Sequence, residues 1–349
     1  LPQGIRELTL TYWEDAEPLR VQPGRVEAVY GAAVDIGTTS VVLHLCNLIS
    51  GEVLVSVTAL NPQILYGEDI MSRVSYCQQN ANGTQVLHDA IIDCLNRLAA
   101  DAAHEAGISP DDILDLCVVG NSVMHHLFLN LDPTPLGQYP FTPQLRASFD
   151  GNAADLGLKF NARAKVHVLP LIAGFVGADT VGALLAAHPQ DNQAVTLLLD
   201  VGPNGELVLG NKDRLIATSS PTGPAFEGGQ ITYGMRAAQG SIERVRLNCA
   251  QETARVRIIG NEHWSDSDEF AEKEVKGICG SGIIEAVGEG YRCGVINPSG
   301  RIESKPPLTT DFLGKPALKL LDKANAASNV DILLTQTDVR AVQLAKAAL

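Results

Sequence analysis

The chain has 349 residues, of which 45% are hydrophobic, enough to form two domains that each have a core. Its formal net charge of −14 comes from 26 basic and 40 acidic residues, and the sequence contains no basic run that would follow a phosphate backbone. These totals argue against nucleic acid or an anionic membrane as the main partner.

The seven cysteines are scattered, without a C-x-x-C pair or the spacing of a metal-ligand set. Their odd number and their apolar surroundings predict the reduced thiols of a cytoplasmic protein, and no signal peptide is visible. The longest apolar tract, residues 166–187, contains Pro170, Asp179 and several glycines. It therefore predicts a buried strand and helix, and no membrane span.

Residues 1–30 contain a short strand-like segment, Glu7–Trp13, followed by a connector with Pro23 and Gly24. We expect this part to be the tail of an upstream linker or middle domain, with little chemistry of its own. A first domain is predicted over residues 31–190 and a second over residues 191–349.

The first domain opens with an apolar run that ends at Asp35 and Gly37 and resumes after Thr38, Thr39 and Ser40. This pattern predicts a strand, a tight turn and a second strand. Glycine permits close approach of the backbone to a ligand, and the amide and hydroxyl groups after it are donors for phosphate oxygens. Asp35 would repel a bare phosphate, so a carboxylate here indicates Mg²⁺ between it and the phosphate.

An amphipathic helix is predicted over about residues 84–106, with Val86, Ile91, Leu95 and Leu98 facing inward. A strand over residues 113–119 follows. Strands and helices then alternate, as in α/β proteins.

Asn121 stands between a glycine and a serine where that strand leads into another helix. Small polar residues at such a place either meet an anion or cap the helix, and both alternatives stay open for Asn121. His125 and His126 on the same helix point to different faces, which disfavours a metal pair.

Asp179 stands where a glycine-rich loop becomes the helix over residues 180–187. A carboxylate at this place could act as a general base toward water or a substrate hydroxyl. The alternative is that Asp179 only caps the helix. The order of the surrounding motifs favours the base.

The pattern of the first hairpin recurs at Asp200 and Gly202, followed by Pro203, Asn204 and Gly205. Two such hairpins, about one domain apart, favour a pair of phosphate loops on one nucleotide over two ordinary Asp-Gly turns. Asp200 is then a second carboxylate facing Mg²⁺. Pro203 has no N–H and removes one donor from the cradle.

Two glycine-rich segments follow the second hairpin. Gly228 belongs to a segment that either walls a nucleotide or is only a wide loop. Gly280, Ser281 and Gly282 open an amphipathic helix, and glycines before a helix suit close approach to a ligand.

A last helix starts near Thr335, with Asp338 placed to form a capping box, and runs to Leu349 without a C-cap. We therefore expect the second domain to be incomplete at its C-terminal side.

The order of these motifs resembles the superfamily of acetate and sugar kinases, heat-shock chaperones and actin (ASKHA ATPases). The resemblance implies a two-lobed, actin-like α/β fold with ribonuclease H-like subdomains, in which mixed sheets are flanked by helices. It also implies ATP and Mg²⁺ as ligands, Asp35 and Asp200 as the Mg²⁺-facing carboxylates, and Asp179 as the general base.

A closer resemblance is to the reductive activators of corrinoid proteins, over about residues 31–349. It rests on strings that occur in order: Val-Asp-Ile-Gly-Thr-Thr at 34–39, Ala-Leu-Asn-Pro-Gln at 59–63, Val-Gly-Asn-Ser-Val-Met at 119–124, Ala-Gly-Phe-Val-Gly-Ala-Asp at 173–179, Gly-Pro-Ala-Phe-Glu-Gly at 223–228, Gly-Met-Arg-Ala-Ala at 234–238 and Cys-Gly-Ser-Gly at 279–282.

This resemblance implies an ATPase that is coupled to electron transfer in anaerobic metabolism and reduces a corrinoid protein from Co(II) to Co(I). The implied partner is a corrinoid iron–sulfur protein or the corrinoid subunit of a methyltransferase, and a homodimer is compatible with the superfamily. The resemblance also implies that electrons come from an N-terminal [2Fe–2S] domain. No ferredoxin-type cysteine set occurs in this sequence, so we expect the cluster in a separate domain.

The resemblance also places the adenosine-binding segment of the superfamily after Leu349, so nucleotide affinity would be weak in this chain. Two other functions stay open at this point. One is a small-molecule kinase of the same superfamily. The other is a nucleotide-gated binding module that does not hydrolyse ATP.

Overall fold

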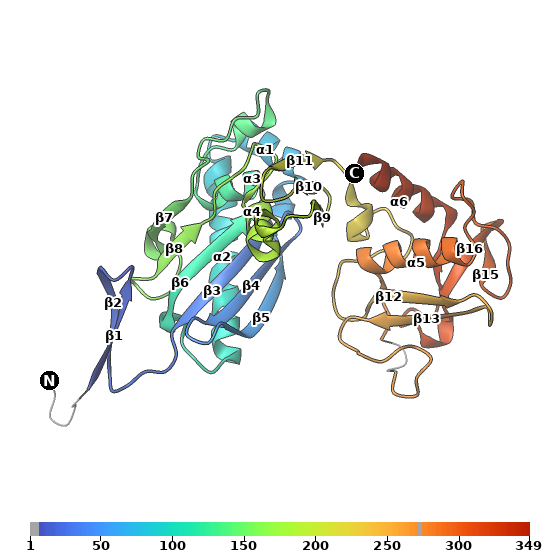
Figure 1. The fold of residues 1–349 in the computed structure, drawn as a ribbon, viewed down its shortest axis with the longest axis horizontal. Coiled ribbons are helices and arrows are strands. Elements are labelled where there is room, and N and C mark those ends of the chain that lie inside the picture. The colour runs from blue at the N-terminus through green and yellow to red at the C-terminus, as the bar shows by residue number, and fades with distance from the viewer. Residues whose placement is uncertain (1–6, 271–273) are drawn as a thin grey trace. The chain divides into compact units, whose positions relative to one another are not determined.

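The structure is a computed structural model that describes residues 7–270 and 274–349. The chain forms two compact units (Figure 1). The first comprises Leu1–Leu198 and Leu209–Thr218, and the second comprises Leu199–Val208 and Ser219–Leu349. Each unit is described by itself below.

A two-stranded hairpin of β1 (Leu8–Trp13) and β2 (Glu17–Pro23) comes first in the chain. The segment that forms β2 was predicted to be a connector. That prediction is wrong, because the segment is a strand in which Val21 pairs with Leu10 of β1. An isolated hairpin is only marginally stable in water, and ion pairs fix this one to the first unit. Arg20 contacts Asp112 at 2.6 Å.

A six-stranded sheet with the order β5-β4-β3-β6-β8-β7 is the centre of the first unit. Strands β3, β4 and β5 form an antiparallel meander, β6 and β8 continue the sheet parallel to β3, and β7 is antiparallel to β8. The bounds are β3 (Tyr30–Ile36), β4 (Ser40–Asn47), β5 (Glu52–Leu60), β6 (Ile113–Gly120), β7 (Phe149–Asn152) and β8 (Lys165–Val168).

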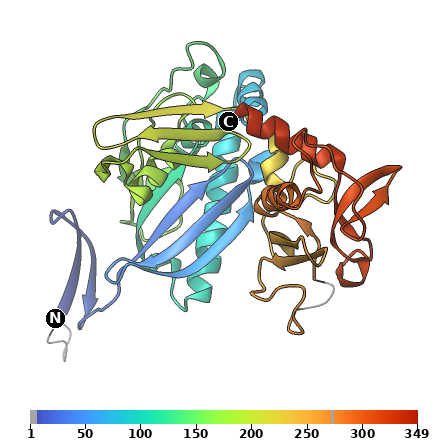
Figure 2. The same cartoon turned by 45° about the vertical axis from the view of Figure 1, so that its right-hand side comes forward.

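Among its described residues this unit has four α-helices: α1 (Ile70–Gln79), α2 (Gly83–Glu105), α3 (Ser122–Phe128) and α4 (Ala178–Ala187). Figures 1 and 2 show the long helix α2 lying along the sheet. Its apolar stripe is buried as the periodicity predicts, with Leu87, Ile91, Leu95 and Leu98 in the core, although Leu87 takes the deep position expected for Val86. The core therefore lies between α2 and the sheet.

A smaller sheet has the order β11-β10-β9, with bounds β9 (Thr196–Val201), β10 (Gly205–Gly210) and β11 (Leu215–Ser220). The predicted second hairpin is the turn between β9 and β10. Strand, turn and strand thus recur as the sequence pattern indicates.

The second unit contains two further small sheets, ordered β13-β12-β14 and β15-β16-β17. Helix α5 (Gly280–Arg292) packs on β12, and α6 (Gln336–Ala348) begins with the predicted capping box of Thr335 and Asp338. The strands are β12 (Ser241–Asn248), β13 (Thr253–Ile258), β14 (Gly277–Ile278), β15 (Thr309–Phe312), β16 (Lys315–Leu321) and β17 (Ile332–Leu334).

The cysteines differ from the expectation that all are reduced. Cys249 and Cys293 form a disulfide, because the turn after β12 brings Cys249 beside the C-terminal end of α5. The remaining five are free thiols. Among the helices of the described residues, none has the length and apolar character that crossing a membrane requires.

Candidate functional site

The turn between β3 and β4 is built from Gly37–Ser40. Ile36 pairs with Val41, and the Gly37 N–H donates to the Ser40 carbonyl oxygen at 2.9 Å. A Cβ atom on residue 37 would lie 2.7 Å from that oxygen, so only glycine fits without a shift of the backbone. The tight turn that the sequence predicts is therefore present.

The carbonyl groups of this turn are held by side chains and backbone from one side. Asn61 donates from Nδ2 to the Gly37 oxygen at 2.8 Å and from its backbone N–H to the Thr39 oxygen at 3.0 Å. Arg73 donates from Nη2 to the Thr38 oxygen. In a trans peptide the next N–H points opposite to the carbonyl, so the amides of residues 38–40 point away from Asn61 and Arg73. Backbone amides of a turn that are left available in this way suit an anion.

Arg73 is fully buried and is the functional candidate that the sequence prediction missed. Its Nε donates to the Gly67 oxygen at 3.0 Å, and its Nη1 lies 3.2 Å from Gln63 Oε1. Burial lowers the pKa of the guanidinium to about 10, which leaves it charged at neutral pH. The sequence feature that could have identified it is an arginine next to Val74 on the apolar face of α1.

Asn121 fulfils one of the two alternatives that the sequence left open, the helix cap. Its Oδ1 accepts from the backbone N–H groups of Val123 and Met124, each at 3.1 Å, so it is the N-cap of α3. Its Nδ2 donates to the Thr38 hydroxyl at 3.0 Å. The cap role is therefore confirmed, and the same side chain also orients a hydroxyl of the predicted phosphate turn.

Asp179 is the second residue of α4, and the N-cap is Gly177, which has no side-chain cap bond. The N-cap alternative for Asp179 is therefore wrong. Its Oδ1 accepts from the Thr180 N–H at 2.7 Å. A Cβ on residue 177 would lie 2.6 Å from both Asp179 Oδ1 and Asn121 Cα, so glycine lets the start of α4 reach the end of β6.

Asp35 is the second-to-last residue of β3, close to the turn. It pairs with Val42 of β4 and with Val119 of β6. The first unit thus brings the predicted residues Asp35, Thr38, Asn121 and Asp179 to the carboxyl ends of β3 and β6, the edge at which α/β sheets bind ligands. Figure 1 shows α3 and α4 at this end of the sheet. Thr39 and Ser40 complete the turn.

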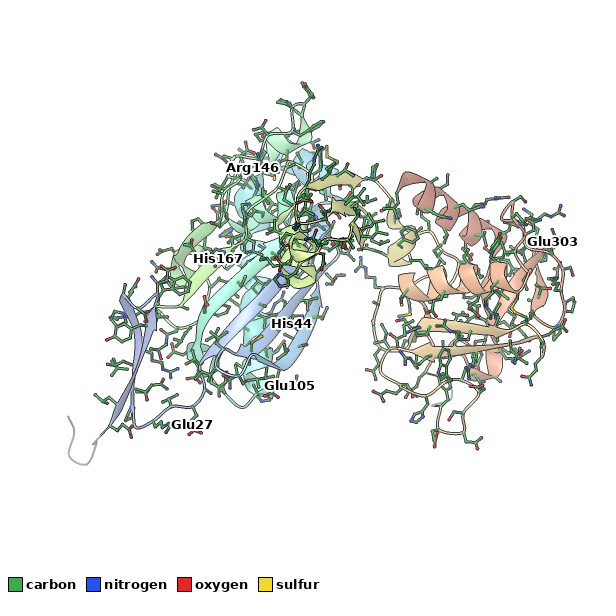
Figure 3. All side chains as sticks on the ribbon, in the orientation of Figure 1. Glu27, His44, Glu105, Arg146, His167 and Glu303 are labelled. Carbon is green, nitrogen blue, oxygen red and sulfur yellow. A yellow bond between two sulfur atoms is a disulfide. The ribbon has the colours of Figure 1, made fainter. Side chains whose placement is uncertain are left out.

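Other polar side chains of the sheet are engaged elsewhere. Figure 3 labels His44 on β4 and His167 on β8. His44 Nδ1 lies 2.7 Å from Ser56 Oγ, and His167 Nδ1 lies 2.7 Å from Asp150 Oδ1. These are cross-strand pairs, and they give no reason to place the histidines in the site.

In the second unit, the turn of Gly202, Pro203 and Asn204 joins β9 to β10. The Gly202 N–H donates to the Asn204 oxygen at 3.3 Å. The Thr222 hydroxyl donates to the Gly202 oxygen, and the Gly223 N–H donates to the Pro203 oxygen at 2.9 Å. The turn carbonyls are again held by the protein.

Gly205, just after the turn, packs tightly, since a Cβ there would lie 2.5 Å from Leu349 Cδ2. Next to the turn, loss of hydration raises the pKa of the Asp200 carboxyl, and the bond from the Val201 N–H partly offsets this shift.

The segment after Gly223 forms the 3₁₀ turn η6 (Pro224–Glu227) and ends at Gly228, whose φ is +79°. It packs on the start of α5, because a Cβ on Gly280 would lie 1.6 Å from the Phe226 oxygen. A Cβ on Gly282 would lie 2.3 Å from the Ile242 oxygen. Both glycines have a packing reason that the sequence did not reveal, and Ser281 between them is exposed.

Within the described residues, no group of three or more histidine, cysteine, aspartate or glutamate side chains is placed to hold a metal ion. Mg²⁺ differs from structural metals because one or two carboxylates, water and phosphate oxygens are sufficient ligands. Asp35 in the first unit and Asp200 in the second are each a single carboxylate of this kind. Their metal role stays a prediction.

Comparison with known proteins identifies the relatives of the chain. Residues 30–191 match the family model of the RACo middle region, and residues 194–349 match that of the C-terminal domain of RACo, the ASKHA domain. A solved structure described as the reductive activator for corrinoid, iron–sulfur protein has a TM-score of 0.83 and 33% sequence identity, and the match covers 97% of this chain and 53% of that one.

Two curated relatives support the same family. The corrinoid activation enzyme RamQ of Eubacterium limosum is 36% identical over 330 residues, which are 92% of this chain and 53% of RamQ. The [Co(II) methylated amine-specific corrinoid protein] reductase of Methanosarcina barkeri is 26% identical over 298 residues, which are 78% of this chain and 54% of the reductase. The chain spans about half the length of these relatives.

The predicted resemblance and the predicted α/β fold are thereby confirmed. The chain belongs to the RACo family of reductive activators of corrinoid proteins, and it carries the middle region and ASKHA-domain sequence of that family.

Proposed function

We propose that the chain is the ATP-binding and ATP-hydrolysing part of a reductive activator that returns a corrinoid protein from Co(II) to Co(I). The observation that supports nucleotide binding best is the turn of Gly37–Ser40, whose carbonyls are held by Asn61 and Arg73 so that its amides point the other way. The names of the two curated relatives support a corrinoid protein as the partner.

Residues 31–190 and 191–349 would act as the first and second ASKHA subdomains, each with one phosphate loop. Asp35 and Asp200 would hold Mg²⁺ through water, and Mg²⁺ when bound would neutralise charge on the phosphates. Asn121 would orient the Thr38 hydroxyl toward a phosphate oxygen. Asp179 would accept a proton from the attacking water, since its position beside Asn121 places it at the same edge of the sheet.

Glycines and small polar residues of the second unit would complete the nucleotide site: Gly202, Asn204 and Gly205 in the second loop, and Gly228, Gly280, Ser281 and Gly282 along the wall. Their support is that one segment contacts both places: the Thr222 hydroxyl donates to the Gly202 oxygen, and Phe226, four residues later, packs against Gly280 at the start of α5.

ATP is needed because reduction of Co(II) in these proteins is too unfavourable for ordinary donors. Nucleotide-dependent binding would favour a state of the corrinoid protein that accepts the electron more easily. The electron would come from a [2Fe–2S] domain that is not among these 349 residues. We further propose a cytoplasmic location, where ATP is abundant, and a homodimer.

One observation favours a second candidate. Pro203 has no N–H, and its carbonyl is held by Gly223, so the second turn offers fewer donors than the first. A nucleotide-gated binding module, which holds ATP and partner without hydrolysis, would need fewer donors around the transferred phosphate.

ADP release distinguishes the candidates. The protein is mixed with Mg-ATP and a Co(II) corrinoid protein, a low-potential reductant is supplied, and ADP and the Co(I) absorbance are followed together. We expect ADP formation to rise with the corrinoid protein and to fall about a hundredfold in Asp179→Asn, the size expected for a general base. Asp101→Asn, on the exposed surface of α2, is the matched control.

Co(I) formation that needs ATP but yields no ADP would favour the binding module. Phosphate transfer to a small molecule in the absence of corrinoid protein would favour the kinase.

A further inference from the structure

The disulfide of Cys249 and Cys293 joins two elements of the second unit. Cys249 lies in the turn between β12 and β13, and Cys293 is the C-cap of α5. Their Cα atoms are 5.2 Å apart and they are separated by 44 residues in sequence. The bond therefore ties the end of α5 to the tip of a hairpin, which has no role in the proposed nucleotide chemistry.

One sulfur of this bond is open to reagents. Cys249 is exposed and Cys293 is half-buried. Cys249 forms part of the wall of a pocket of about 910 Å³, which Arg246, Asn248, Gln251, Arg255 and Arg292 also line. A pocket of this size accommodates a molecule as large as a tripeptide. Exposed disulfides are generally the ones that exchange with thiols.

Cationic groups surround the disulfide. Arg292 Nη1 lies 3.3 Å from Cys249 Sγ, and Lys305 Nζ lies 3.3 Å from the Cys293 carbonyl oxygen. Positive charge next to a sulfur stabilises its thiolate, so it promotes both attack by an anionic thiol and departure of the thiolate.

Carboxylates also face these cations. Glu289 pairs with Arg292 and Glu285 pairs with Arg246, each at 2.7 Å, while Asp266 lies 3.5 Å from Arg255. Of the three carboxylates, only Asp266 lines the pocket, against the three arginines. Three guanidinium groups and one carboxylate therefore line the pocket, and each guanidinium also has a carboxylate neighbour. Guanidinium groups bind carboxylates in a planar, bidentate manner.

We propose that the Cys249–Cys293 disulfide is a redox-active site that exchanges with a carboxylate-bearing, low-molecular-weight thiol bound in the arginine-lined pocket. The thiolate attacks Cys249 Sγ, the bond between the two cysteine sulfurs breaks, and Cys293 leaves as a thiolate that takes up a proton. A second thiolate then attacks the mixed disulfide and releases Cys249. Two thiols are oxidised to one disulfide, and one protein disulfide is reduced to two thiols.

The first test counts cysteines. The protein is denatured without reductant, treated with iodoacetamide and weighed by mass spectrometry. We expect five alkylated cysteines before reduction and seven after it, since five of the seven are free in the structure. Seven alkylated cysteines before reduction would overturn the proposal.

The second test compares two thiols of opposite charge. Reduction of the native disulfide is followed with glutathione, which is anionic, and with cysteamine, which is cationic, each rate being corrected for its thiolate fraction. We expect glutathione to react about tenfold faster at low ionic strength, and the difference to vanish at about 0.5 M salt. Peptide mapping should find the mixed disulfide on Cys249 when Cys293→Ser is treated with oxidised glutathione.

Variants test whether the arginines of the pocket cause the preference for the anionic thiol. Arg246→Gln with Arg292→Gln should lower the glutathione rate about tenfold and lower the cysteamine rate by a smaller factor, because loss of Arg292 affects the leaving thiolate for both thiols. The matched control, Arg301→Gln with Arg340→Gln, removes two exposed arginines of the same unit outside the pocket and should change neither rate. Equal rates for the two thiols in the unaltered protein would contradict the pocket's part in the reaction. Neither test uses nucleotide or corrinoid, so each outcome is independent of the proposed function.

Discussion

Asn121 donates from Nδ2 to the Thr38 hydroxyl at 3.0 Å while its Oδ1 caps helix α3. One side chain thus connects the start of a helix to the turn between β3 and β4. The two bonds use different atoms of the amide, so substitutions can separate the structural bond from the bond to the turn.

Asn121→Asp should keep the cap and lose the donor to Thr38. We expect the free energy of unfolding to stay within about 0.5 kcal/mol of the unaltered protein, since Asp and Asn are similar N-caps. The affinity for Mg-ATP should fall about tenfold, the value of one lost hydrogen bond. Calorimetry and urea unfolding measure the two quantities. Asn121→Ala is the comparison, because it should lose about 1 kcal/mol of stability as well.

Arg73→Met should destabilise the first unit. The substitution removes the buried donor to the Thr38 and Gly67 oxygens, and it leaves those acceptors and Gln63 without this partner. We expect a loss of about 2 kcal/mol or more in the free energy of unfolding. Arg97→Met, on the exposed face of α2, is the control and should change stability by less than about 0.5 kcal/mol. Equal effects of the two substitutions would refute this account of the turn.

Two glycines of α5 should respond oppositely to alanine. A Cβ on Gly280 would lie 1.6 Å from the Phe226 oxygen, whereas a Cβ on Gly288 meets nothing within 4 Å. Gly280→Ala should therefore cost about 2 kcal/mol through displaced backbone, and Gly288→Ala should stabilise by about 0.5–1 kcal/mol through helix propensity. Thermal unfolding of both variants checks the pair, and a stable Gly280→Ala protein would show that η6 does not pack on α5 as described.

His125 should make the protein sensitive to acid. It is 2% exposed, its ring nitrogens have no hydrogen-bond partner among the described residues, and burial lowers its pKa to about 4. The unfolded state, with the ordinary pKa of about 6.5, binds the proton more readily than the folded state. Stability on this account is full above pH 6.5 and falls by about 3 kcal/mol as the pH decreases to about 4.

His125→Leu should remove that part of the acid sensitivity. Urea unfolding between pH 7 and pH 4 measures the slope, and His104→Leu on the surface of α2 is the control. An unchanged slope in His125→Leu would mean that other groups cause the acid sensitivity.

Much of the fold could be predicted because its elements have local patterns. The apolar stripe of α2, the turn at Gly37 and the capping box of Thr335 and Asp338 depend on neighbouring residues in sequence, and all are present. The motifs, taken in order along the chain, also indicated the resemblance to reductive activators. The roles of the aspartates stay predictions, since the structure gives their places and no ligand.

Long-range contacts explain what the sequence did not reveal. Arg73 reaches the Thr38 oxygen from α1, and Cys249 meets Cys293 only after a hairpin and a helix have packed. Gly280 packs against the Phe226 oxygen, which lies more than fifty residues earlier in the chain. None of these partners can be identified by spacing along the chain.

The coupling between nucleotide and corrinoid protein tests the central claim most directly. Calorimetry measures the affinity of the protein for Mg-ATP alone and with saturating Co(II) corrinoid iron–sulfur protein or Co(II) methylated amine-specific corrinoid protein. We expect one of them to bind and to change the Mg-ATP affinity by about fivefold or more, with a reciprocal change in its own affinity. Mg-ATP binding that is identical with and without either corrinoid protein would contradict the proposed function.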